Sequence, residues 1–140
     1  MKVEKSLLLL IVLLIFSFGF GQHKLSLDIK GVSSDNGNVC VAIYQDQNSF
    51  LKFDKVFKIG SEKAVKGSTH IEIDDIPVGE YAVAIFHDEN GNKKLDTNFM
   101  GIPKEAIAFS RGKMKMFGPP RFDECAFEIV SNTNIRIDLQ

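Results

Sequence analysis

The sequence predicts an all-β fold, a single antiparallel β-sandwich of about seven strands. Three observations support this fold class. Short runs of apolar residues alternate with polar ones at a period of two, the spacing of a half-buried strand. Gly and Pro interrupt the N-terminal half of the chain roughly every eight to twelve residues, as turns do in sandwiches. No segment after Gly21 carries a long apolar stripe at helical spacing.

A signal-peptide helix is predicted before the sandwich. Lys2 and Lys5 precede the apolar run Leu7–Phe16, and Gly19 and Gly21 fit the small-residue positions before a cleavage site. We expect cleavage after Gly21. The alternative is an uncleaved membrane anchor, which needs about 20 apolar residues. Because the run is shorter, we expect an exported protein, periplasmic or secreted, with no permanent membrane span after cleavage.

Residues 1–21 are therefore assigned to the signal peptide and residues 22–140 to one β-sandwich domain. The formal net charge of the 140-residue chain is −1, which gives no support to nucleic-acid binding. Its two cysteines are too few for a disulfide-dense miniprotein or a four-thiolate zinc site.

The strands follow in order along the mature chain. Residues 25–29, 69–73, 125–130 and 135–139 alternate apolar and polar side chains, and each run predicts a half-buried strand. Val39–Tyr44 is continuously apolar and predicts a strand covered on both faces. Tyr81–His87 is apolar on both faces and predicts a central strand. Phe50, Phe53 and Phe57 fit either a short helix or a strand.

A candidate calcium loop follows the predicted central strand. Oxygen-bearing side chains fall at loop positions 1, 3, 5 and 9, which are Asp88, Asn90, Asn92 and Asp96, and the Lys94 carbonyl adds a further ligand. This alternate spacing is typical of calcium loops, because a tight coil turns such oxygens inward. A Ca²⁺ ion is therefore one candidate cofactor; no other is indicated.

The calcium pattern is incomplete. Lys93 stands where such loops use Gly for a sharp turn, and Phe99 stands where a bidentate Glu is expected. Affinity is then weak unless Glu89 or a distant acid such as Glu105 contributes. The other interpretation is a metal-free polar turn, in which Asn and Asp side chains cap their own backbone.

The stretch Gly101–Phe122 is irregular and long for a loop, and such loops often carry function. It contains one acidic residue, Glu105, and the rest of the mature chain is acidic. It could hold an anionic ligand such as a glycan or a lipid headgroup, or it could be a solvated loop that balances neighbouring acids. Its basic residues are Lys104, Arg111, Lys113, Lys115 and Arg121.

Five apolar residues of the same stretch are expected to pack it onto the sandwich, with an apolar ligand slot as the alternative. They are Phe109, Met114, Met116, Phe117 and Phe122.

Cys40 and Cys125 both fall in predicted strands. An exported protein meets an oxidising compartment, so a disulfide between them is one possibility. The other is two separately buried thiols, since a bridge requires Cα atoms within about 7 Å.

No catalytic residue is assigned. His87 ends the central strand beside Asp88 and could act as a base toward Ser110 with neighbouring acids. A structural histidine that hydrogen-bonds the following loop is the other interpretation, because no nucleophile elbow surrounds Ser110.

Several motifs, taken in their order along the chain, resemble an exported bacterial family, domain of unknown function 2141. They are Ile76–Asn92, Leu95–Phe99, Gly101–Glu105, Phe109–Ser110 and Phe117–Phe122. The resemblance spans essentially the whole mature chain and implies no known activity. The family usually shows Gly in place of Lys93 and Ala in place of Cys125.

The Pro-Gly-Tyr pattern at residues 77–81 is also loosely similar to transthyretin-like and collagen-binding B-type modules, which are immunoglobulin-like sandwiches. Some of those modules carry a calcium loop. Together these features predict a non-enzymatic binding module of the envelope or the exterior, of unidentified ligand. The alternatives are an envelope hydrolase that uses His87 with neighbouring acids, and a purely structural accessory domain.

Overall fold

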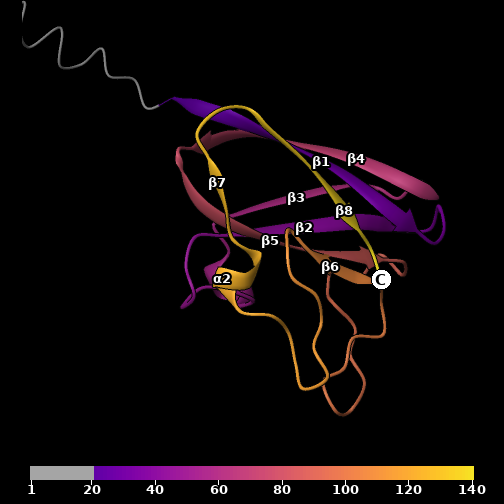
Figure 1. Ribbon diagram of the computed structural model, residues 1–140. Coiled ribbons are helices and arrows are strands. Elements are labelled where there is room, and N and C mark those ends of the chain that lie inside the picture. The colour runs from indigo at the N-terminus through magenta and orange to yellow at the C-terminus, as the bar shows by residue number, and fades with distance from the viewer. Residues whose placement is uncertain (1–20) are drawn as a thin grey trace, which may run out of the picture.

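The computed structural model describes residues 21–140, and within them it contains eight strands and two short helical segments (Figure 1). The predicted signal peptide lies outside the described residues, apart from Gly21. The elements are β1 (Gln22–Val32), β2 (Asn38–Tyr44), η1 (Phe53–Lys55), β3 (Lys58–Lys63), β4 (Gly67–Pro77), β5 (Gly79–Asp88), β6 (Ile107–Phe109), α2 (Phe122–Cys125), β7 (Phe127–Ile129) and β8 (Thr133–Asp138).

Two sheets pack face to face, which confirms the predicted all-β sandwich (Figure 1). One sheet has the strand order β4-β1-β8 and the other has the order β3-β2-β5-β6. β7 also pairs with β5, at Gly79–Tyr81, while β6 pairs with Ala84–Phe86 further along the same strand. β5 is therefore central to its sheet, as its two apolar faces predict.

One strand pair departs from the antiparallel arrangement that the sequence predicts. β8 runs parallel to β1, with Leu25 opposite Thr133 and Lys30 opposite Asp138. The chain crosses from β7 in the second sheet to β8 in the first, so β8 enters beside β1 in the same direction. Hairpin signals in a sequence do not reveal such a crossing.

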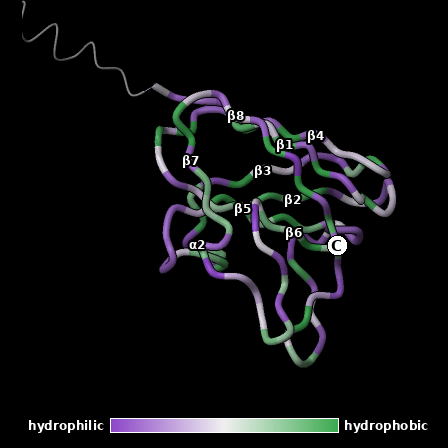
Figure 2. Tube along the Cα trace, in the orientation of Figure 1, coloured by the Kyte–Doolittle hydropathy of each residue, from purple (hydrophilic) through white to green (hydrophobic). Residues whose placement is uncertain are grey.

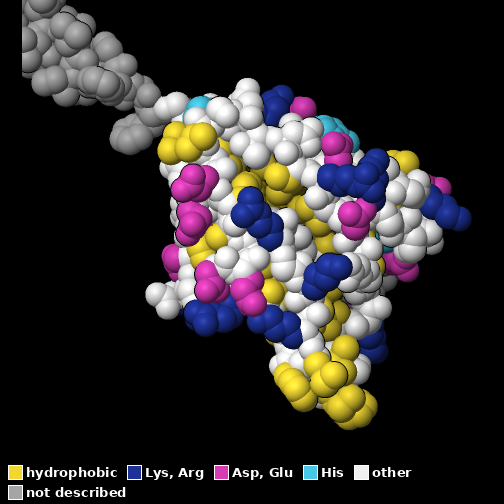
Figure 3. All heavy atoms as spheres, in the orientation of Figure 1, with side chains coloured by type: hydrophobic (Ala, Val, Ile, Leu, Met, Phe, Trp, Pro, Cys, Tyr) yellow, Lys and Arg dark blue, Asp and Glu magenta, His cyan; other side chains and the backbone are white. Residues whose placement is uncertain are grey.

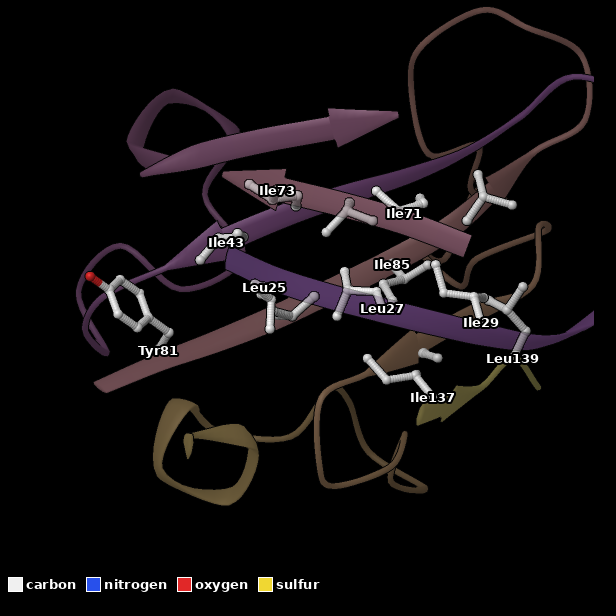
Figure 4. Close-up of a cluster of buried hydrophobic side chains, with 14 of the residues drawn as sticks. Leu25, Leu27, Ile29, Ile43, Ile71, Ile73, Tyr81, Ile85, Ile137 and Leu139 are labelled. Atoms are coloured by element: carbon white, nitrogen blue, oxygen red, sulfur yellow. The ribbon is translucent and has the colours of Figure 1, made fainter. Parts of the chain in front are cut away.

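The main core lies between the two sheets and is built from the inward faces of the alternating strands. β1 contributes Leu25, Leu27 and Ile29, all fully buried, and β2 and β5 contribute residues such as Ile43 and Ile85 (Figure 4). The same alternation of hydrophobic and hydrophilic residues is visible along the strands in Figure 2. Burial of this surface is what fixes the strand register.

Some elements differ from the sequence prediction. β3 is an exposed edge strand whose Ile59 faces solvent, so it lacks the apolar alternation that reveals a half-buried strand. β6 lies inside the stretch predicted to be irregular, and Cys125 ends α2 instead of starting a strand. Phe50 packs on Tyr44 with a ring-centroid separation of 5.5 Å, and Phe53 begins the 3-10 turn η1.

Candidate functional site

The long connections of the second sheet gather at one end of the domain. Residues 89–106 connect β5 to β6, and residues 110–121 connect β6 to α2. Both loops extend away from the sandwich in the same direction (Figure 1). They contain most of the candidate calcium loop, the basic residues and half of the exposed large apolar residues of the described chain.

The candidate calcium loop folds back on itself through its own side chains. Asp88 is fully buried, and its carboxylate accepts hydrogen bonds from the backbone N–H groups of Asn92 (3.1 Å) and Lys93 (2.8 Å). The side-chain amides of Asn90 (2.6 Å) and Asn92 (3.1 Å) donate to the Asp96 carboxylate. The side chains of Asp88, Asn90, Asn92 and Asp96 are thus linked within one hydrogen-bonded coil.

Glu105 joins this coil from the returning arm of the loop. One of its carboxylate oxygens accepts a hydrogen bond from the Asp96 backbone N–H at 3.0 Å. The other oxygen, Oε1, is buried and has no hydrogen-bond partner in the structure. Among residues 21–140, no three His, Cys, Asp or Glu side chains form a group that could hold a metal ion. Any cation here would depend on asparagine and main-chain oxygens as well as on carboxylates.

Lys93 adopts a left-handed backbone with φ of 62°. This is the sharp turn for which calcium loops use Gly at position 6, so the turn is made here despite a side chain that disfavours it. An L-residue with a Cβ pays about 1 kcal/mol or more in this region.

His87 is a buried structural residue with both ring nitrogens engaged. Its Nε2 donates to the Asn36 carbonyl at 2.8 Å, and its Nδ1 lies 3.2 Å from the Ser33 hydroxyl. That hydroxyl donates to Glu89 at 2.5 Å and lowers the pKa of the Glu89 carboxyl group. His87 thus ties the β1–β2 turn to the beginning of the 89–106 loop.

Ser110 does not pair with His87. Its hydroxyl donates to the Cys125 carbonyl at 2.6 Å and accepts from the Val83 backbone N–H at 3.0 Å. Both hydrogen bonds position the 110–121 loop against α2 and β5. A nucleophile with His87 as its base is therefore not assembled in this structure.

The basic residues divide into paired and unpaired groups. Lys115 contacts Glu124 at 2.6 Å and Arg121 contacts Asp123 at 3.4 Å, so both are balanced by α2. The Arg121 backbone N–H and Lys115 lower the pKa of Glu124. No ion pair forms for the others within the described part of the chain, namely Lys93, Lys94, Lys104, Arg111 and Lys113.

The tips of the two loops expose large apolar side chains, which the sequence reasoning missed. Phe99 and Phe117 are each 96% exposed. Phe109 and Phe122 pack onto the sandwich as expected, but Met114, Met116 and Phe117 do not. We call the exposed set the apolar tip; it consists of Phe99, Met100, Ile102, Met116 and Phe117 (Figures 2 and 3).

Both tips are tight turns that hydrogen bonds close. The Asn98 side chain accepts hydrogen bonds from Met100 N–H (2.9 Å) and Ile102 N–H (3.0 Å). Lys115 and Gly118 exchange backbone hydrogen bonds across Met116 and Phe117. The turns therefore direct their polar groups inward and their apolar side chains outward.

An apolar groove lies behind the tip, between the outer face of the second sheet and the loops, with a volume of about 200 Å³. Its floor includes Ala42 and Ala84, which are direct cross-strand neighbours on β2 and β5. Because both side chains are small, they leave open space above the sheet. Its walls and roof include Tyr44, Phe86, Ile107, Phe109, Leu95, Pro103 and Met114.

Tyr44 supplies a polar atom of this groove. The residue lines the groove and is 2% exposed. Burial raises the pKa of Tyr44 to about 12, so the phenol stays neutral.

Comparison with protein families gives one match. The model of a family described as an uncharacterized protein conserved in bacteria, DUF2141, matches residues 27–138. The chain belongs to this family. No curated protein and no solved structure matches the chain. The resemblance drawn from the ordered motifs is thereby confirmed, while the looser similarity to transthyretin-like modules stays a prediction.

Cys125, where the DUF2141 family resemblance leads one to expect Ala, is a buried free thiol, and Cys40 is also free. Cys40 lies on β2 opposite Phe86, whereas Cys125 precedes Phe127, which pairs with Tyr81. Phe86 and Tyr81 mark the positions of the two cysteines along β5, and at about 3.3 Å per residue they are more than 10 Å apart. This separation is too large for a disulfide. The disulfide alternative is therefore not realised, and burial raises the pKa of Cys125 to about 11.

No helix within residues 21–140 is long and apolar enough to cross a membrane.

The sequence of this DUF2141 domain contains a signal that could have predicted the exposed apolar tip. Phe-Met and Met-Phe pairs occupy positions between turn-forming residues, Asn98 and Gly101 in one loop and Gly118 in the other. Turn apices usually carry Gly, Asn, Asp or Ser.

Proposed function

We propose that this protein is an exported, non-enzymatic binding module that docks on an anionic lipid surface through its apolar tip. The observation that carries the proposal is the exposure of Phe99, Met100, Met116 and Phe117 at the apices of two adjacent loops. Contiguous exposed apolar patches mark membrane or protein interaction sites. Departures from a local turn preference are expected at functional or strained sites.

The charge around the tip favours a lipid surface over a protein partner. Five basic residues of the two loops lack ion pairs within the described chain, while the rest of the mature chain is acidic. Each Lys or Arg near an anionic membrane contributes about 1 kcal/mol. Full burial of a Phe or Met side chain contributes about 1.5–3 kcal/mol. The two contributions act at the same end of the domain and orient it with its acidic body away from the lipid.

Vesicle co-sedimentation of the mature domain tests the proposal. We expect binding to phosphatidylglycerol vesicles, weaker binding to phosphatidylcholine vesicles, and loss of binding in Phe99→Ser and Phe117→Ser. Val130→Ser is the matched control, because Val130 is also an exposed apolar residue but lies in the turn between β7 and β8, at the opposite end (Figure 1). Equal binding by the wild type and both tip variants would contradict the proposal.

A cation in the 88–96 loop is a second component of the proposed function. The observation that favours it is the buried Glu105 Oε1, a carboxylate oxygen without a donor beside Asp96. Calcium takes 6–8 oxygen ligands, and Asp88, Asn90, Asn92, Asp96, Glu105 and the Lys94 carbonyl would have to supply most of them. Bound calcium would also place positive charge near the tip.

Thermal unfolding in millimolar calcium and in chelator tests the cation. A ligand that binds only the native state raises the melting temperature. We expect a rise for the wild type, none for Asp96→Asn, and none with magnesium. Equal midpoints for the wild type in calcium and in chelator would exclude the cation and leave the lipid proposal standing.

The hydrolase alternative has less support. His87 is fully buried, with both ring nitrogens engaged, and Ser110 is hydrogen-bonded elsewhere. A general base has to reach the proton that it removes.

A further inference from the structure

A second hollow adjoins the apolar groove and differs from it in chemistry. It has a volume of about 360 Å³ and lies between the start of the 110–121 loop and the end of β8. The two hollows share the lining residues Ile107, Phe109 and Met114. We call the second one the basic hollow, because Arg111, Lys113 and Arg136 line it.

The positive charge of the basic hollow is only partly balanced. Arg136 lies 3.3 Å from Asp138, which also lines the hollow. Arg111 and Lys113 are exposed and form no ion pair within the described residues. An anionic group in the hollow would therefore meet two cationic side chains without displacing an existing partner.

We propose that the two hollows together bind a single-chain anionic amphiphile of the fatty-acid class. The alkyl chain lies in the apolar groove over Ala42 and Ala84, and the carboxylate lies in the basic hollow against Arg111 and Lys113. Ligand sites typically combine apolar walls with a few polar groups that fix orientation. A dry apolar cavity of about 150 Å³ accepts a benzene-sized molecule, so the groove accepts a short alkyl chain.

This inference does not depend on the lipid-surface proposal. The apolar tip is built from the loop apices, whereas the ligand lies behind them against β2, β5 and β6. Free fatty acid is the occupant proposed here, and a membrane would be one source of it. Vesicles free of fatty acid therefore test the tip and not the groove.

Titration of the mature domain with decanoate tests the inference. The sequence has no Trp and two Tyr, and the Tyr81 hydroxyl donates to the Pro77 carbonyl away from the groove. Tyr44 emission therefore reports on the groove contents, and calorimetry provides an independent measure. We expect saturable binding of decanoate, binding by decanol that is about tenfold weaker, and no saturable binding of decyltrimethylammonium.

Three variants separate the chain and head contacts. Ala84→Leu fills the floor of the groove and should abolish decanoate binding. The double variant Arg111→Gln, Lys113→Gln should weaken decanoate binding about tenfold and leave decanol binding unchanged. Lys115→Gln is the matched control, because Lys115 is a basic residue of the same loop that pairs with Glu124 outside the hollow.

The Gln variants change exposed side chains and should have the melting temperature of the wild type. They therefore still test the head-group contacts if Ala84→Leu fails to fold. Equal affinity for decanoate, decanol and decyltrimethylammonium, or unaltered decanoate binding by the double Gln variant, would overturn the inference. Phe117→Ser should lose vesicle binding and keep decanoate binding, which distinguishes failure of the tip from failure of the groove.

Discussion

Gly37 offers the sharpest test of how the β1–β2 turn supports the candidate site. It has φ of +64°, and a Cβ built on it would lie 1.8 Å from the Asp88 carbonyl oxygen. Gly91, in the loop just after β5, has φ of +71°, and nothing lies within 4 Å of its Cβ position. Both substitutions therefore place alanine in a left-handed conformation, which is unfavourable. Only Gly37→Ala also brings the new Cβ into collision with the backbone of Asp88.

The magnitudes follow from the neighbouring contacts. A left-handed alanine costs about 1 kcal/mol in each variant. In Gly37→Ala the backbones of residues 37 and 88 have to separate, which disturbs the Asn36 carbonyl that accepts from buried His87 at 2.8 Å. An unsatisfied buried group costs about 1–3 kcal/mol more. We expect a loss of about 2–4 kcal/mol for Gly37→Ala and about 1 kcal/mol for Gly91→Ala.

Urea and thermal unfolding measure this difference. For a domain of this size, 1 kcal/mol corresponds to about 4 °C, so Gly37→Ala should melt about 8–16 °C below the wild type and Gly91→Ala about 4 °C below it. Equal losses of stability in the two variants would contradict this prediction, since they would show that the close approach of Gly37 to Asp88 has no energetic consequence.

Two further predictions concern stability. Lys93→Gly should raise the free energy of unfolding by about 0.5–1 kcal/mol, because Lys93 has φ of 62° and Gly adopts that region without strain; a lower stability in urea would contradict this. His70 on β4 lies opposite Asp28 on β1, and a hydrogen bond of 2.7 Å raises the pKa of His70 and lowers the pKa of Asp28. A raised histidine pKa contributes stability that is present below about pH 6.5 and is lost as pH rises through the folded-state pKa, whereas the Asp28 contribution is lost as pH falls below about 4. The melting temperature of the wild type should therefore fall more steeply between pH 5.5 and 8 than that of His70→Gln, and parallel pH profiles would count against the pair.

The fold class, the central strand and the family could all be predicted from the amino-acid sequence. Period-two alternation in residues 25–29 and 69–73 identified half-buried strands, because burial of one sheet face imposes that period on any chain. The same pattern failed at β3, whose residues face solvent, and at β6, which has three residues and is too short to show a period. The spacing of Asp88, Asn90, Asn92 and Asp96 also predicted that these side chains gather, since local chain geometry governs them.

Other features depend on contacts between segments that are far apart in the sequence. Whether β8 runs parallel to β1, and whether Cys40 meets Cys125, depends on where distant strands pack, which no local pattern encodes. The same holds for Met116 and Phe117, which the sequence predicted to pack against the sandwich and which are exposed to solvent in the structure. Apolar character predicts burial only on average, because it does not say which surface is available. The space behind the tip, bounded by Ala42, Ala84 and the basic hollow, exists only once the loops are folded over the sheet.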